Sequence, residues 1–382
     1  MPWKELCALD QRIELVNDWL NRDYTITELS NIYGVSRKTI YKWIERFQNR
    51  GISGLGERSR APLNHPNATP IDIVDMIIKA KLIKQRWGPK KIVARLEYER
   101  PDINWPAIST VSEILNREGL VRHRKKRHHT PPYSEPFRGT TCPNAVWSAD
   151  YKGQFRLGNG KLCYPLTITD NYSRYLLGCW ALERPSFEHT QPWFEWTFRE
   201  YGLPYAIRTD NGTPFASIAP GGLSRLSVWF IKLGIIPERI KLGQPQQNGR
   251  HERMHRTLKE AAVAPPRDNI RQQQRVFDRF ANEFNNERPH EALGQRTPAS
   301  NYQRSLREYP TKLKPVEYAQ GTLVKHIHTR GYMKWKGELV YVSENLAKEN
   351  IGLRRISEYE WDMRFSFHHI GIFDEQKRMI TN

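Results

Sequence analysis

The chain has 382 residues, 38% of them hydrophobic, and its 60 Lys and Arg residues outnumber 41 Asp and Glu residues, which gives a formal net charge of +19. Lys and Arg displace the counterions that condense on nucleic acid, so this surplus favours a polyanionic partner. The sequence has no apolar run of membrane-spanning length and no signal-peptide pattern at its start, which predicts a cytoplasmic protein without a membrane partner. A chain of this length predicts about two to four domains.

Cysteine and histidine spacing predicts no zinc site. Cys7, Cys142, Cys163 and Cys179 are scattered, and none belongs to a CxxC pair. The adjacent histidines at positions 128 and 129 have no cysteine pair near them. We therefore expect reduced structural thiols.

Residues 9–50 carry the pattern of three short helices. In the first, an apolar stripe at helical spacing is formed by Ile13, Val16, Trp19 and Leu20. This stripe predicts the face that packs against the other two helices.

The second and third helices of this segment have the order helix, glycine turn, Ser-capped basic helix. We expect Thr27 to cap the second helix, Gly34 to form the turn and Ser36 to cap the third, which is the helix-turn-helix pattern. An ordinary helical hairpin with a solvated basic face is the alternative, and the net charge favours DNA binding. The basic residues on the outer face are Arg37, Lys38, Lys42 and Arg46.

A linker rich in Gly, Ser, Arg and Pro leads to a second helical segment. Residues 71–99 and 106–121 repeat the helical periodicity and predict a second, looser helix-turn-helix. Residues 122–129, RHRKKRHH, then form a charge run. Such runs are often merely solvated, but between DNA-binding units phosphate contact is at least as well favoured. The candidate contacts in this run are Arg124, Lys125, Lys126 and Arg127.

The pattern changes to β-type segments at residue 147. Three segments between residues 147 and 182 predict antiparallel strands, with Gly158-Asn159-Gly160 as the turn between the first two. Helices and short strands then alternate as far as residue 286, which predicts a mixed α/β domain. Residues 316–371 alternate apolar with polar side chains and predict a small antiparallel β-barrel.

Three acidic residues occupy positions where side chains from separate elements can meet. Asp150 lies in the first strand, Asp210 follows the fourth strand and opens an Asp-Asn-Gly turn, and Glu252 stands just inside a helix. Singly, each has an ordinary explanation as a surface residue, a turn former or a carboxylate favoured by the helix dipole. Together, in so basic a protein, they predict a magnesium site, because Mg²⁺ prefers oxygen ligands and binds a few carboxylates with substrate phosphate.

Two other carboxylates are alternatives. Glu238 is nearer to Asp210 in sequence but lacks the helix-start context of Glu252. Asp170 ends a strand as a ligand could, but the Asp-Asn pair before YSRY is sufficient as a hairpin turn.

Five segments occur in a fixed order: WSADYKG, TITDNYSRY, IRTDNGTPFAS, PQQNGRHERMHRTLK and FNNERPHEALGQRTP. This series resembles the motifs of DDE-type insertion-sequence transposases, which are relatives of retroviral integrases, over residues 140–305. The resemblance implies a ribonuclease-H-like core in which Asp150, Asp210 and Glu252 are the catalytic triad and bind two Mg²⁺ or Mn²⁺ ions.

The interval between the last two triad positions is longer than the family's commonest spacing, and SIAPGGLSRLS is the added loop. The resemblance also implies that Lys259, two helical turns after Glu252, contacts the terminal DNA. Arg253 and Arg256 are the next candidates, with an ordinary exposed basic helix face as the alternative.

The sequence thus predicts a multidomain α/β chain. Its expected parts are a helix-turn-helix domain at 1–60, a second helix-turn-helix with a basic linker at 61–135, an integrase-like core at 136–310 and a β-barrel at 311–382.

We expect a transposase that acts on DNA as a homo-oligomer, with no small-molecule substrate, and that would associate with the nucleoid in a bacterium. It would bind the terminal inverted repeats of a mobile element, cleave the element's ends and join them to target DNA. A domesticated, non-catalytic DNA-binding regulator that keeps the same fold is the alternative. A simple ribonuclease-H-like nuclease is disfavoured, because a nonspecific nuclease needs no sequence-reading domains.

Overall fold

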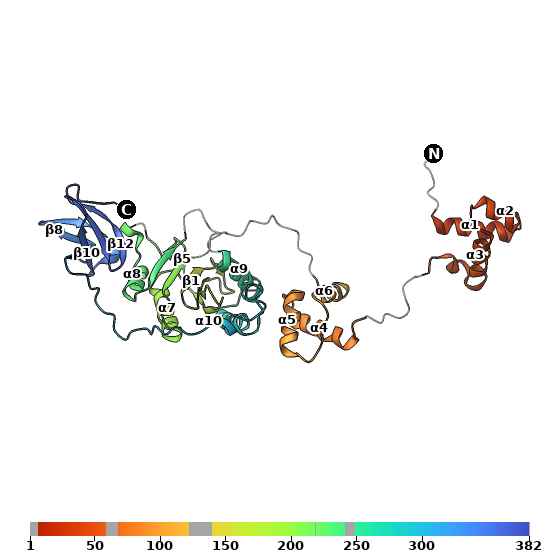
Figure 1. Ribbon diagram of the computed structural model, residues 1–382, viewed down its shortest axis with the longest axis horizontal. Coiled ribbons are helices and arrows are strands. Elements are labelled where there is room, and N and C mark those ends of the chain that lie inside the picture. Colours follow the sequence, from red (N-terminus) through yellow and green to blue (C-terminus); the bar gives the residue numbers. More distant parts are fainter. Residues whose placement is uncertain (1–6, 59–67, 122–139, 218, 241–248, 382) are drawn as a thin grey trace. The chain divides into compact units, whose positions relative to one another are not determined.

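A computed structural model describes residues 7–58, 68–121, 140–217, 219–240 and 249–381 (Figure 1). The chain divides into two compact units, Met1–Thr69 and Pro70–Asn382. No helix among the described residues is long and apolar enough to cross a membrane. All four cysteines are free thiols.

The first unit is all-helical, as the sequence predicts. Its elements are α1 (Ala8–Asn21), α2 (Ile26–Ile32), α3 (Arg37–Arg50) and a 3-10 turn at Gly51–Leu55. Ser36 caps α3 through its side chain, which accepts a hydrogen bond from the Thr39 amide at 3.2 Å.

Two details of this unit differ from the sequence prediction. The cap of α2 is Thr25 rather than Thr27, because Thr25 and Glu28 close a reciprocal capping box in which the Thr25 amide donates to the Glu28 carboxylate at 2.7 Å. The buried stripe of α1 is centred on Leu15 and Val16, whereas Leu20 is 53% exposed. A small rotation of α1 about its own axis buries a different set of side chains. Helical periodicity alone therefore did not decide which stripe of α1 is buried.

The second unit begins with another three-helix bundle, made of α4 (Ile71–Ile83), α5 (Pro89–Glu99) and α6 (Ile108–Arg117). Its own hydrophobic cluster includes Ile77, Trp87 and Leu115. The predicted basic contacts at 124–127 lie outside the described residues.

A mixed sheet forms the centre of the second unit. Its strands are β1 (Val146–Tyr151), β2 (Phe155–Arg156), β3 (Leu162–Asp170), β4 (Leu176–Leu182), β5 (Ala206–Thr209) and β6 (Ile236–Arg239). The order is β2-β3-β1-β5-β6. Strand β4 also pairs with β3, on the edge opposite β1. Strands β1, β3 and β4 are antiparallel, while β5 and β6 run parallel to β1.

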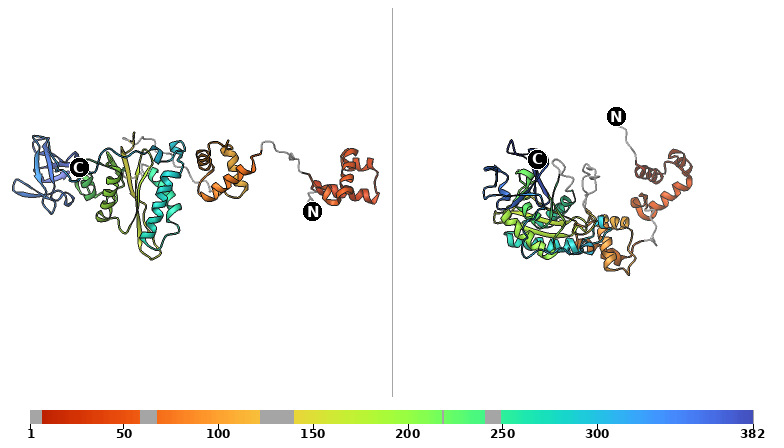
Figure 2. Two further views of the ribbon diagram at one scale, coloured as in Figure 1. Left: turned by 90° about the horizontal axis from the view of Figure 1, so that it is seen from below. Right: turned by 60° about the vertical axis from the view of Figure 1, so that its left-hand side comes forward.

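Helices cover both faces of this sheet (Figures 1 and 2). Along β4, Trp180 and Leu182 join one hydrophobic cluster with α7 (Phe187–Tyr201) and α8 (Arg225–Lys232). The alternate residues Cys179 and Ala181 join a second cluster. That cluster includes residues of α9 (Gly249–Leu258), its π-helical extension Lys259–Val263, α10 (Ile270–Asn282) and the π-turn Glu283–Glu287. Three antiparallel strands, two further strands parallel to β1 and helices on both faces agree with the ribonuclease-H-like class.

The C-terminal region is antiparallel, as predicted. Its strands are β7 (Leu323–His326), β8 (Tyr332–Trp335), β9 (Glu338–Tyr341), β10 (Asn350–Arg355), β11 (Glu360–Phe365), β12 (His368–Asp374) and β13 (Met379–Thr381). They form a five-stranded sheet, β13-β12-β11-β10-β7, and a separate β8-β9 hairpin. Within the described residues no strand pairing closes this sheet into a barrel.

The added loop lies where the C-terminal sheet meets α8. Leu223, Val228 and Ile231 belong to the same hydrophobic cluster as the buried side chains of the C-terminal sheet. The Asn345 side-chain amide donates to the Leu223 carbonyl at 2.9 Å. The segment that lengthens the interval between Asp210 and Glu252 therefore helps to seat the C-terminal sheet.

Candidate active site

Strand register brings the chain segments that carry Asp150 and Asp210 next to each other. In the parallel β1-β5 pair, Val146 is opposite Ala206 and Ser148 is opposite Arg208. The same offset continued by two residues sets Asp210, just after β5, level with Asp150. Neighbouring strands lie about 4.8 Å apart, so two carboxylates reach the same edge of the sheet.

Asp210 is a half-buried turn residue. Its Oδ1 accepts a hydrogen bond from the Gly212 amide at 3.1 Å, which closes an Asx turn. A Cβ at Gly212 would lie 3.1 Å from Asp210 Oδ2, so glycine leaves room beside that second oxygen. The turn therefore fixes one oxygen and leaves space at the other.

Glu252 lies in the first turn of α9 on its exposed face. The buried side of the helix carries His251, Met254, His255 and Leu258. The rival carboxylate Glu238 is engaged elsewhere, because Arg208 Nη2 lies 2.7 Å from its Oε2. We name the positions of Asp150, Asp210 and Glu252 the carboxylate edge; that these three carboxylates converge on metal stays a prediction.

Asp170 belongs to the turn between β3 and β4. Oδ1 of its buried carboxylate accepts from the Asn144 amide at 2.9 Å and Oδ2 accepts from the Ser173 amide at 2.7 Å. Burial raises the pKa of this carboxyl, while its hydrogen bonds to Ser173 and Asn144 act in the opposite direction. In the β1-β3 register Asp170 faces Trp147, three positions from Asp150.

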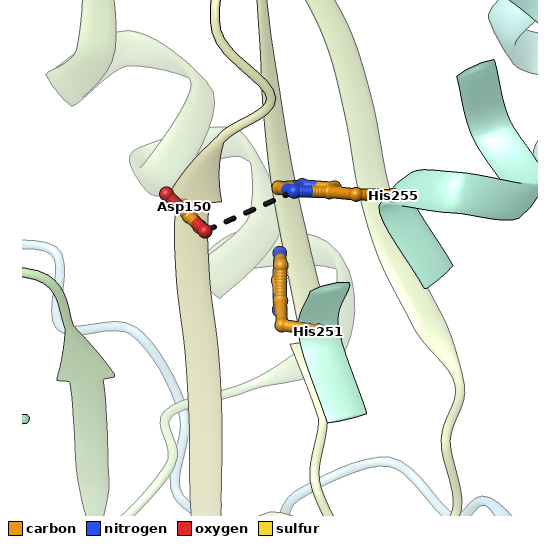
Figure 3. A group of neighbouring side chains, drawn as sticks. All are labelled: Asp150, His251 and His255. Carbon is orange, nitrogen blue, oxygen red and sulfur yellow. Dashed lines mark ion pairs between the residues drawn. The ribbon is translucent and has the colours of Figure 1, made fainter. Parts of the chain in front are cut away.

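Two histidines that the sequence prediction overlooked lie beside Asp150 (Figure 3). His251 and His255 extend from consecutive turns of α9, and the Nε2 atoms of both lie 2.7 Å from Thr167 Oγ1. Thr167 is the register partner of Asp150 in the β1-β3 pair. The signal was present in the sequence. Residues four apart share one helical face, and the two histidines of HERMH are four residues apart.

The nitrogen Nδ1 of His255 lies 3.8 Å from Asp150 Oδ2. This approach is not an ion pair, because burial, the nearby His251 and Lys152 lower the pKa of His255 to about 2. Burial likewise lowers the pKa of His251 to about 3. Both imidazoles are therefore neutral at physiological pH.

One group of three or more metal-ligating side chains occurs among the described residues, and it is formed by Asp150, His251 and His255. Their ligand atoms lie within 4.8 Å of one another. A carboxylate with neutral imidazoles is a donor set that fits a divalent cation. The group does not include Asp210 or Glu252.

The predicted DNA contacts that the structure describes lie on helix surfaces. On α3, Arg37, Lys38 and Lys42 are exposed, whereas Arg46 is half-buried with its guanidinium 4.8 Å from the centre of the Trp43 ring. The exposed basic residues at and after α9 are Arg253, Arg256 and Lys259.

Two further guanidinium groups meet near the start of α9. Arg174 and Arg250 both donate to the Asn171 carbonyl oxygen, with Arg250 Nη1 at 3.3 Å. Burial lowers the pKa of Arg174 to about 10, and the neighbouring charges of Arg250 and Arg253 act in the same direction. The sequence prediction did not name Arg174 or Arg250.

Comparisons with known proteins agree with this architecture. Models of an integrase core domain match residues 140–245 and 233–298. A helix-turn-helix domain matches residues 11–62 and a homeodomain-like domain matches residues 39–115.

Similar proteins come from insertion elements, a transposon and a retrovirus. An insertion element IS407 uncharacterized protein of Burkholderia multivorans is 26% identical and covers 62% of this chain and 83% of its own. The transposase for transposon Tn552 of Staphylococcus aureus is 21% identical over 65% of this chain and 55% of its own. The integrase catalytic core domain of HTLV-2, solved in complex with magnesium, is 16% identical, with a TM-score of 0.34 over 43% of this chain and 99% of its own.

The integrase core matches cover all five ordered motifs in full, and the matches to DNA-binding domains precede them. The function is accordingly of the transposase type, in which DNA binding accompanies DNA recombination. By its motifs, its integrase core matches and its insertion-element relatives, the chain is similar to the DDE transposases of the integrase superfamily.

Proposed function

We propose that the protein binds the ends of a mobile DNA element, cleaves the DNA there and joins the freed 3′ end to target DNA. The observation that supports this proposal is the β1-β5 register, which pairs Ser148 with Arg208, two residues before Asp150 and Asp210. Glu252 lies in the first turn of α9. Water attacks the phosphodiester in the first step, and the freed 3′-hydroxyl attacks target DNA in the second.

The carboxylate edge would hold two Mg²⁺ or Mn²⁺ ions through Asp150, Asp210 and Glu252. Bound there, the cations would act as Lewis acids that neutralise charge on the phosphate and on the leaving oxygen. The chain itself supplies orientation. The Asx turn fixes one oxygen of Asp210, and the polar contacts of Thr167 hold α9 against β3.

DNA would be held by two groups of basic residues. The exposed residues of α3, Arg37, Lys38 and Lys42, would recognise the element's terminal repeats, with Arg46 supporting them. Near α9, Arg253, Arg256 and Lys259 would contact phosphates of the cleaved end, as would Arg124, Lys125, Lys126 and Arg127 in the basic run. Phosphate contacts position the duplex, and base contacts supply specificity.

Assembly follows from the number of ends. A mobile element has two ends, and one carboxylate edge engages one 3′ end at a time, so a homo-oligomer would act on the paired ends inside the cell. The four-part division at 1–60, 61–135, 136–310 and 311–382 remains our proposal for how these tasks are distributed. The substrate is DNA alone, with no small molecule.

The test is a reaction of the full chain with labelled duplexes that carry the element's ends, with and without Mg²⁺. We expect metal-dependent cleavage and joining in the wild type and none in Asp150→Asn. Specific end binding without cleavage in either metal would instead support a non-catalytic DNA-binding regulator. Cleavage that ignores the end sequence would support a nuclease.

A further inference from the structure

The hydrogen-bond arrangement around Thr167 engages Nε2 of His255 and leaves its Nδ1 atom toward Asp150. The Thr167 hydroxyl has one proton to donate and lies within hydrogen-bond distance of the Asp150 carbonyl, at 3.1 Å, and of both histidine Nε2 atoms, at 2.7 Å. Each neutral imidazole carries one N–H. If the hydroxyl donates to the Asp150 carbonyl, both Nε2 atoms must carry hydrogen and donate to Thr167.

In that arrangement the two Nδ1 atoms differ in what they face. His251 Nδ1 accepts from the hydroxyl of Thr169, whose Oγ1 lies 3.1 Å away. His255 Nδ1 then carries the lone pair, and it is the ring nitrogen nearer the Asp150 carboxylate (Figure 3), with 3.8 Å between the nitrogen and Oδ2. If Thr167 instead donates to His251 Nε2, His255 Nε2 must still carry the hydrogen that it donates to Thr167. The Nδ1 atom of His255 then again carries no hydrogen.

The remaining arrangement, in which Thr167 donates to His255 Nε2, gives no better contact. It places the N–H at Nδ1 of His255, but 3.8 Å from Asp150 Oδ2 is too long for a hydrogen bond. A nitrogen lone pair and a carboxylate oxygen at this separation match two donors of one cation, because each bond to such an ion is about 2.0–2.2 Å long.

The position of His255 on α9 agrees with this assignment. Glu252 and His255 form a Glu-x-x-His pair, and residues three apart are neighbours on a helix surface. The same spacing directs a carboxylate and an imidazole to one metal site in di-iron and di-manganese carboxylate bundles. Thr167 would act as the outer partner that orients the ring, as hydrogen bonds to the second ring nitrogen do in known metal sites.

We propose that His255 is a metal ligand through Nδ1, sharing one divalent cation with Asp150, and that this nitrogen makes the site favour Mn²⁺ over Mg²⁺. The inference rests on the proposed function, because it assumes that the carboxylate edge binds a cation. Imidazole is a good ligand for transition metals, whereas Mg²⁺ strongly prefers oxygen, which gives the metal preference its cause. His251 has no such role, because threonine hydroxyls engage both of its ring nitrogens.

Pulsed electron paramagnetic resonance of the full chain with Mn²⁺ tests the assignment directly. We expect nitrogen modulations from a bound imidazole in the wild type, altered in protein made with ¹⁵N-histidine. They should vanish in His255→Gln and persist in His251→Gln, a matched control one turn away on the same buried face. The apparent Kd for Mn²⁺ should rise about 10-fold or more in His255→Gln, with little change for Mg²⁺.

Other outcomes separate this inference from the proposed function. Mn²⁺ that binds in an Asp150-dependent way without nitrogen modulations would overturn the role of His255 and leave the carboxylate site standing. Modulations lost only in His251→Gln would also overturn it. No Mn²⁺ binding at all, even with an end duplex, would contradict both. If His255→Gln does not fold, as judged by circular dichroism, the ¹⁵N-histidine measurement on the wild type still decides whether an imidazole binds the metal.

Discussion

The carboxylate edge and the helix α3 differ in how their functional side chains are brought together. On α3, Arg37, Lys38 and Lys42 lie within a single helix of 14 residues. The carboxylate edge takes Asp150 from β1, Asp210 from the turn after β5 and Glu252 from α9. The first arrangement depends on one helix, while the second depends on strand register and on the docking of a distant helix.

This difference has consequences for loss of function. Basic residues on one helix add phosphate contacts one by one, so removing them weakens DNA binding by steps. Carboxylates that bind one metal site act together, so removing any one of them abolishes the chemistry.

Substitution at the carboxylate edge should have the largest effect. We expect Asp150→Asn, Asp210→Asn and Glu252→Gln each to reduce cleavage and joining by about 10³-fold or more, because a neutral amide binds the cations far more weakly. Binding to the element's ends should stay nearly unchanged, as a gel-shift titration of the same preparations would show.

Glu238→Gln is the control for this series, because Glu238 is paired with Arg208. If Glu252→Gln joins DNA at a near-normal rate and Glu238→Gln loses joining, Glu238 rather than Glu252 is the third carboxylate of the metal site.

Removal of residues 311–382 should damage the second unit and spare the first. The truncation uncovers Leu223, Val228 and Ile231, which are buried in the cluster of the C-terminal sheet. Exposing such a side chain costs about 1.5–3 kcal/mol, so we expect the second unit to lose about 5 kcal/mol or more of stability.

Joining should be lost in this truncation while residual end binding remains. Calorimetry should record a lower melting temperature for the second unit and an unchanged transition for residues 1–69. A fully active truncation would contradict this assignment.

Substitutions on α3 should weaken binding gradually. We expect Arg37→Ala, Lys38→Ala and Lys42→Ala each to make the log–log slope of end affinity against salt concentration less negative by about 0.9, if each residue neutralises one phosphate. The exposed, uncharged Gln48→Ala on the same helix is the control and should leave the slope unchanged. A wild type that binds scrambled and specific duplexes equally at every salt concentration would reduce α3 to a nonspecific basic surface.

Helix capping should show the smallest effect. Thr25→Ala removes the capping box of α2 and should cost about 1 kcal/mol of the stability of the first unit. Thr27→Ala, one residue inside the same helix and exposed, should cost much less. Urea unfolding of both variants measures the difference, and the reverse order would restore Thr27 as the cap.

The sequence by itself determined the features that depend on local chemistry. Ser36 was correctly predicted as the cap of α3. The Asp-Asn-Gly turn after β5 and the order of the five motifs also followed from adjacent residues. Such signals depend on residues a few positions apart, so they can be recognised without knowledge of tertiary contacts.

The tertiary structure decided which distant side chains meet. The register of β1 against β3 sets Thr167 beside Asp150, and the docking of α9 brings His251 and His255 to the same hydroxyl. The α9 motif was recognised for Glu252, but its spacing could not show which helical face packs on the sheet. The reason is physical: the docking of α9 on β3 is set by burial between segments that lie 80 or more residues apart, and no local pattern encodes that partner.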